Sequence, residues 1–151
     1  MYYFSFGSFM DIDYIKKHVP NIKFVTTAVV PNWEVQFNHY APSINAGATG
    51  AEPNPGKIAY GVIYELTEEE MMYLDKVEHV YEAQYFRQNV VAVDEKGKFY
   101  SVWLYRTTNP DGPFETNRFY LGKILKGAKD VKLPQEYIDK LQSHYDSLPE
   151  D

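Results

Sequence analysis

Cysteine is absent from this 151-residue chain, which excludes disulfides, cysteine metal sites and thiol nucleophiles. Long hydrophobic runs are also missing, because no apolar stretch approaches the roughly 20 residues that a membrane-spanning helix needs. Positive charge is scarce, with 15 Lys and Arg against 21 Asp and Glu and a formal net charge of −6. Surfaces that bind nucleic acid or anionic membranes need clustered basic residues, so the sequence argues against both partners.

Motifs for cofactors and targeting are missing too. The histidines have no partners at metal-ligand spacing, and no glycine-rich nucleotide loop occurs, so neither a metal nor another cofactor is expected. They are His18, His39, His79 and His144. Met1 leads into a mixed polar segment without the basic and apolar regions of a signal peptide, which favours a cytoplasmic location.

Aromatic residues are abundant at 17% of the chain, with 14 Tyr and 9 Phe. Tyrosine suits a pleated surface that is apolar on one side and polar at its tip, so a β-rich body is expected. A plain tyrosine-rich sheet and a sheet that lines a polar cavity fit this composition equally well. The length suits one domain, residues 1–151, with a substantial core.

Strand and helix patterns alternate along the chain. Strand patterns cover residues 2–6, 24–30 (ending at Pro31), 33–38, 58–66, 85–93 and 99–105, the last two forming a hairpin. Helix patterns begin at Asp11 and run to His18, at Thr67 with a capping box to Glu70, at Pro113 with a break at Gly127, and at Pro134. These elements predict an α+β fold in which mostly antiparallel strands close into a small barrel with helices at its rim.

Residues 41–57 carry Pro, Gly, Ala, Asn and Ser without periodicity and predict a long loop. Such a loop is either functional or a plain flexible insertion.

Two other features could carry chemistry. The Gly7-Ser8 turn could bring backbone N–H groups close to a carboxylate or an oxyanion, although it could also be an ordinary turn. Glu78 ends the helix that Thr67 opens, where the helix dipole and an apolar setting would raise its pKa, although it could also be a surface residue.

Several motifs carry a resemblance to a known family. They are Tyr3-Phe4-Ser5-Phe6-Gly7-Ser8, the strand Gly61-Val62-Ile63-Tyr64-Glu65-Leu66, the segment Leu74-Asp75-Lys76-Val77-Glu78 with Tyr85, and a tail with Tyr120, Gly127-Ala128, Leu133-Pro134 and Tyr137-Ile138. In this order they resemble the γ-glutamylcyclotransferase-like family, with its Tyr-Gly-Ser-Asn loop, its Leu-Asp-x-x-Glu-Gly segment and its helical tail. Three positions differ from the family pattern, because Phe6, Phe9 and His79 replace its loop tyrosine, its asparagine and its glycine.

The resemblance implies a small barrel with flanking helices, a cavity and an acyl-transfer activity. This activity splits a γ-glutamyl amide into 5-oxoproline and a free amine or amino acid. Glu78 would be the general base and acid, and Gly7 and Ser8 would bind the glutamyl end. The other candidate substrate-binding positions are Phe6, Phe9, Tyr85 and Tyr120.

This reaction suits a chain without cysteine or cofactor motifs, because the substrate's own α-amine is the nucleophile and one carboxyl group can relay the proton. Two other classes stay open. One is a catalytically silent barrel that binds a small γ-glutamyl-like or carboxylate ligand, and the other is an interaction module. The sequence also leaves the oligomeric state open, a homodimer included.

Overall fold

The computed structural model describes residues 1–150. Its strands are β1 (Tyr2–Ser5), β2 (Lys23–Ala41), β3 (Ala46–Glu65), β4 (Tyr85–Val93) and β5 (Phe99–Thr107). Its helices are the 3-10 turn η1 (Ser8–Met10), α1 (Ile12–Ile15), α2 (Glu68–Val77), α3 (Arg118–Asp130) and α4 (Gln135–Ser147). The predicted α+β class is therefore confirmed.

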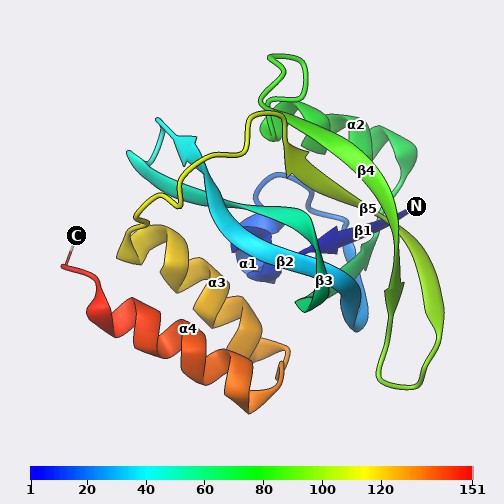
Figure 1. Ribbon diagram of the computed structural model, residues 1–151. Coiled ribbons are helices and arrows are strands. Elements are labelled where there is room, and N and C mark those ends of the chain that lie inside the picture. The colour runs from blue at the N-terminus through cyan, green and yellow to red at the C-terminus, as the bar shows by residue number, and fades with distance from the viewer. Residues whose placement is uncertain (151) are drawn as a thin grey trace.

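The five strands close into a barrel in the order β1-β3-β2-β4-β5. Neighbouring strands are antiparallel except for β1 and β5, which meet in parallel at Tyr3 and Trp103. Two hairpins, β2–β3 and β4–β5, form most of the wall, and the second hairpin is the predicted one (Figure 1). The small, mostly antiparallel barrel with flanking helices that the sequence predicts is confirmed.

Capping side chains explain where α1 and α2 begin. The Asp11 carboxylate accepts hydrogen bonds from the N–H groups of Asp13 and Tyr14 at 3.1 and 3.4 Å. Thr67 and Glu70 form the predicted capping box, with bonds of 2.8 and 3.1 Å. A helix begins at each of these caps because the side chains satisfy N–H groups that have no partner inside the helix.

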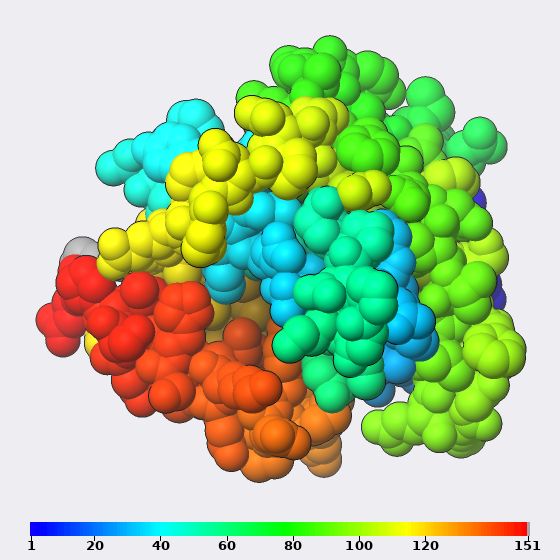
Figure 2. Space-filling view, viewed as in Figure 1, coloured from blue at the N-terminus to red at the C-terminus, as the bar shows by residue number. Residues whose placement is uncertain are grey.

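The last two helices cover one side of the barrel. α3 and α4 lie side by side below β2 and β3, while α2 lies at the opposite end (Figure 1). The segment between β5 and α3 crosses this face of the molecule to reach them, and α4 lies at the surface (Figure 2). No helix among residues 1–150 is both long enough and apolar enough to cross a membrane.

The prediction of a long loop over residues 41–57 is wrong. A turn ends at Asn45, and β3 then runs through the rest of the segment. Its small residues are buried because neighbouring groups approach closely: a Cβ on Gly47 would lie 2.7 Å from the Phe114 carbonyl oxygen. A Cβ on Gly50 would lie 2.3 Å from the Asn38 amide oxygen. The small side chains thus reflect tight packing of a strand and not a loop.

Four boundary predictions are also wrong. The helix predicted from Asp11 to His18 ends at Ile15, and turns follow it. β2 continues past Pro31 with a register shift, because a strand tolerates proline at such an irregularity. Residues 113–117 are not helical, and α3 begins after Asn117, whose side chain accepts the Tyr120 N–H at 2.9 Å. Gly127 does not break α3 but lies within it. The final helix does begin after Pro134, as predicted.

Apolar side chains form two buried clusters. One fills the barrel and includes Phe4, Val30, Ile63, Val102 and Leu104. The other lies between the barrel and the helices and includes Ile15, Tyr64, Leu74, Leu121 and Ile124. The second cluster holds α2 and α3 against the barrel end where η1 begins, and this is where the candidate site lies.

Candidate active site

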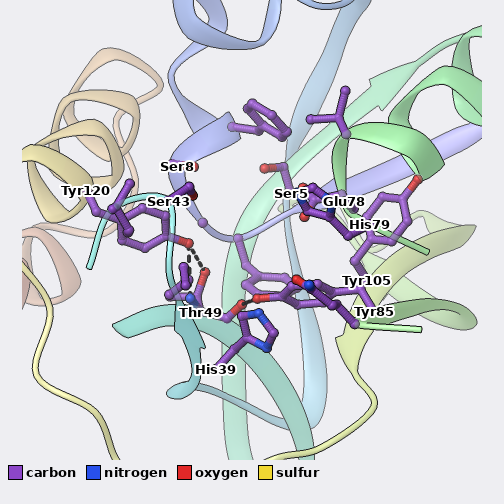
Figure 3. Close-up of a pocket in the computed structure, with 18 of the residues that line it drawn as sticks. Ser5, Ser8, His39, Ser43, Thr49, Glu78, His79, Tyr85, Tyr105 and Tyr120 are labelled. Atoms are coloured by element: carbon purple, nitrogen blue, oxygen red, sulfur yellow. Dashed lines mark hydrogen bonds between the residues drawn. The ribbon is translucent and has the colours of Figure 1, made fainter. Parts of the chain in front are cut away.

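A cavity of about 460 Å³ opens where β1 runs into η1. All seven site residues that the sequence nominates line it. They are Phe6, Gly7, Ser8, Phe9, Glu78, Tyr85 and Tyr120. Glu78 comes from the end of α2 and Tyr120 from α3, and the two lie on different sides of the cavity (Figure 3). The fold thus brings together residues that are more than 100 positions apart in the sequence.

The Gly7-Ser8 turn connects β1 to η1 at the cavity wall. Gly7 must be glycine because a Cβ there would lie 2.4 Å from the Thr49 hydroxyl oxygen. The first N–H that bonds within the turn is that of Met10, which donates to the Gly7 carbonyl at 3.0 Å. The N–H groups of Ser8 and Phe9 precede it, so they can serve a ligand in the cavity.

A network of hydroxyl groups fixes the wall opposite Glu78. The Thr49 hydroxyl and the Tyr120 hydroxyl lie 2.7 Å apart, and the Thr49 N–H donates to the Tyr120 oxygen at 3.0 Å. The Tyr85 hydroxyl donates to the Thr49 carbonyl at 3.0 Å. Both tyrosines from the predicted site are therefore held in place through one residue of β3 (Figure 3).

Glu78 is held by the C-terminal cap of α2. Its N–H donates to the Leu74 carbonyl at 2.8 Å, and the next two N–H groups, of His79 and Val80, donate to Lys76 and Asp75 at 3.1 and 2.9 Å. This is a Schellman motif, which places the residue after the cap in the left-handed region. That residue is His79, with a φ of 55°.

Burial raises the pKa of the Glu78 carboxyl to about 7. The sequence predicted the direction, and burial in the cavity wall is the cause that the structure supports. Five tyrosines line the same cavity as this carboxyl, and each has a pKa that is raised first by its own burial and further by the charge of Glu78. They are Tyr3, Tyr14, Tyr85, Tyr105 and Tyr120. A carboxyl group near half-ionisation at neutral pH can both take and return a proton.

Comparison with known proteins places the chain in a family. Residues 59–141 match the AIG2-like family. The chain belongs to this AIG2-like family. Two relatives, both named gamma-glutamylcyclotransferase, align with this AIG2-like chain over 145 residues, or 93% of it and 77% of each relative. The protein from Bos taurus is 26% identical and the one from Mus musculus is 25% identical.

Solved structures share the fold of this AIG2-like protein. A structure named gamma-glutamyl cyclotransferase superposes with a TM-score of 0.91 at 22% identity, covering 100% of this chain and 89% of that one. An uncharacterized protein from Homo sapiens superposes with a TM-score of 0.89 at 23% identity, covering 99% and 88%. The resemblance that the sequence carries to γ-glutamylcyclotransferases is thus confirmed at the level of family and fold.

The two phenylalanines of the turn differ in their surroundings. Phe6 packs into the barrel core beside Phe4, with ring centroids 6.4 Å apart. Phe9 packs against Tyr14 and His18, with ring centroids 5.5 and 5.6 Å away. In this AIG2-like protein both rings thus present apolar surface to the cavity next to the turn.

Sequence reasoning missed several polar residues of the cavity. Thr49 lay in the segment interpreted as a loop, and His39 lay in a strand with no motif around it. His39 packs on Tyr85 with ring centroids 4.5 Å apart, and its Nδ1 lies 3.0 Å from the Thr107 hydroxyl. Burial lowers the pKa of His39, which favours its neutral form. The hydroxyl of Ser5 is buried without a hydrogen bond of normal geometry, although it lies near enough to the Tyr3 hydroxyl to affect its pKa.

The cavity wall carries one carboxylate and no lysine or arginine among the residues that the structure describes. Within the same residues, no three His, Asp or Glu side chains come together as metal ligands would. The site therefore offers one carboxyl group, three histidines, several hydroxyls and the N–H groups of Ser8 and Phe9, which precede the first hydrogen-bonded N–H of η1. That set suits a reaction whose nucleophile and positive charge come with the substrate.

Proposed function

We propose that this AIG2-like protein is a γ-glutamylcyclotransferase that works without a cofactor. It would convert a γ-glutamyl amide into 5-oxoproline and a free amine or amino acid. The observation that carries this proposal is Glu78, a partly buried carboxyl whose pKa is raised to about 7, in the same cavity as the Gly7-Ser8 turn. The two relatives named gamma-glutamylcyclotransferase, which align over 93% of the chain, support it independently.

The reaction follows from the chemistry of the substrate and the placement of these groups. The ionised Glu78 carboxylate takes a proton from the α-ammonium of the glutamyl group. The freed amine attacks the γ-carbonyl carbon, forming the C–N bond of a five-membered ring and a tetrahedral oxyanion. The N–H groups of Ser8 and Phe9 stabilise this oxyanion. Glu78 then returns its proton to the departing nitrogen, and the original amide C–N bond breaks. The ring nitrogen, which still carries two hydrogens after the attack, gives up the second one to the same carboxylate, which passes it to the released amine, so that neutral lactam and ammonium products leave.

The substrate makes a protein nucleophile unnecessary, because its α-amine is already tethered to the carbonyl that it attacks. Holding the two groups in contact supplies much of the rate enhancement in such intramolecular reactions. The substrate's ammonium group also supplies the positive charge that faces Glu78 when it binds. A cytoplasmic location belongs to the same proposal, and fractionation of cells that make the protein would test it.

The apolar turn favours one alternative. Phe6 and Phe9 leave Ser8 as the one polar side chain among residues 6–9, which would suit a barrel that binds a γ-glutamyl-like or carboxylate ligand without turnover. The raised pKa of Glu78 favours the enzyme over the silent barrel, because binding alone does not need a group poised for proton transfer.

Release of 5-oxoproline from a panel of γ-glutamyl compounds tests the proposal, with Glu78→Gln as the decisive variant. Glutamine keeps the size of the side chain and cannot relay a proton, so turnover should fall about a hundredfold or more. Glu82→Gln is the matched control, because this side chain is exposed four residues further on. Equal turnover by both variants would contradict the role of Glu78, and binding without product from the wild-type protein would favour the silent barrel.

A further inference from the structure

A second acidic residue of α2 is buried beside the cavity. The Asp75 side chain is 6% exposed and lies 3.1 Å from Nε of Arg87. Tyr105, a residue that lines the cavity, donates its hydroxyl hydrogen to the same carboxylate at 2.7 Å. A buried carboxylate needs such partners, because an unpaired charge in the interior is strongly destabilising.

The two partners of Asp75 come from the β4–β5 hairpin. Arg87 and Tyr105 face each other across the two strands. The guanidinium of Arg87 also lies over the Trp103 ring, 5.2 Å from its centroid. Arg87 is thus held by an aromatic face on one side and a carboxylate on the other, which leaves its planar group little freedom.

Asp75 is also part of the cap that carries Glu78. It lies three residues before Glu78 on α2, and its backbone carbonyl accepts the Val80 N–H at 2.9 Å. We infer that Asp75, held by Arg87 and Tyr105, is a positioning residue that fixes the end of α2 so that Glu78 reaches the γ-glutamyl group. This inference rests on the proposed function, because it deepens the role of Glu78 in that reaction.

The competing explanation is that the Asp75–Arg87 pair only stabilises the fold. The chain offers a matched ion pair for comparison, whose arginine lies on the same hairpin. Arg106 binds Glu52 at 2.8 Å, and its guanidinium lies over the Trp33 ring at 5.5 Å. This second pair has the same kind of ion pair and aromatic contact, but its carboxylate is on β3 and not on α2, and none of its residues lines the cavity.

The test compares kcat and KM for Arg87→Met, Arg87→Lys and the control Arg106→Met. Arg87→Met keeps the apolar stem and removes the charge, so kcat should fall about tenfold or more while KM changes less than about threefold. Small misplacements of a catalytic group have effects of this size. Arg87→Lys keeps a cation over the tryptophan and should recover part of kcat. An equal loss of kcat in Arg87→Met and Arg106→Met would overturn the inference.

Amide hydrogen exchange gives a measurement that needs no turnover. In Arg87→Met, exchange of the Glu78, His79 and Val80 amides should accelerate relative to amides in α4, and in Arg106→Met it should not. Unchanged protection at the α2 cap in Arg87→Met would overturn the inference even in an inactive protein. A wild-type protein that releases no 5-oxoproline, but loses cap protection in Arg87→Met, would contradict the proposed function and leave the positioning of Glu78 supported.

Discussion

Glu78 shows how one residue obtains its chemistry from its surroundings. It shares a cavity wall with five tyrosines, and that wall carries no lysine or arginine among the described residues. Without a cation to stabilise its charged form, burial dominates and raises its pKa to about 7. The same burial that suits Glu78 for proton transfer also lowers the free energy of unfolding when its carboxyl group is ionised.

The free energy of unfolding should therefore depend on pH through Glu78. Its pKa rises from the ordinary 4.5 to about 7 on folding, so between these values the folded state keeps a proton that the unfolded state has lost. Stability of the wild-type protein should fall across this window by up to about 3 kcal/mol and level off above it. Glu78→Gln lacks this titration, so its stability relative to the wild type should increase from pH 5 to pH 8.

Urea unfolding at pH 5 and pH 8 measures this difference. Glu82→Gln serves as the control, because that side chain is exposed and should follow the wild type at both pH values. Parallel stabilities of Glu78→Gln and the wild type at both pH values would mean that Glu78 titrates normally.

At the scale of an element, the two glycines of α3 differ in whether the fold has room for a side chain. Gly127 faces η1, where a Cβ would lie 2.4 Å from the Met10 carbonyl carbon. Gly122 lies on the same helix, and a Cβ there would make an ordinary contact with the Tyr145 ring at 3.5 Å. Helix propensity alone would treat both positions alike.

Replacing each glycine with alanine should therefore change stability in opposite directions. Gly122→Ala should raise the free energy of unfolding by up to about 1 kcal/mol, the gain in helix propensity. Gly127→Ala should lower it by about 1–3 kcal/mol, because backbone must move to admit the methyl group. Thermal unfolding of both variants checks this, and stabilisation by Gly127→Ala would show that η1 does not pack on α3 as described.

At the scale of the whole molecule, the cavity has a distinct chemical character. Its walls combine aromatic rings, hydroxyls and one carboxylate, and the turn between β2 and β3 contributes Pro42, Ser43 and Ile44. Burial favours the neutral form of His39, so this residue supplies no lasting positive charge. Such a cavity provides little to bind a second carboxylate on the leaving group of a substrate.

Glutathione should therefore be a poorer substrate than a simple γ-glutamyl alkylamine. Its leaving dipeptide ends in a carboxylate that would find no lysine or arginine among the described residues of the cavity wall, and a loss of roughly tenfold or more in kcat/KM is expected. A competition assay with both substrates in one tube would measure the ratio of their kcat/KM values directly. Ser43→Lys should raise the relative rate on glutathione, whereas Ser43→Gln should not. Preferential consumption of glutathione by the wild type would contradict this account of the cavity.

The sequence by itself determined much of this protein. The capping box at Thr67, the β4–β5 hairpin and the order of the motifs around Gly7 and Glu78 all depend on residues close together in the chain. Such signals are local, so they predicted the barrel class and nominated seven residues that line one cavity.

Only the tertiary structure decided the rest. Residues 46–51 form a buried strand because distant groups, such as Asn38 and Phe114, leave room for no larger side chain. Thr49 joins the site through Tyr120, and Asp75 gains its importance from Arg87 on another element. These interactions join residues far apart in sequence, and their strength depends on burial, which no local pattern encodes.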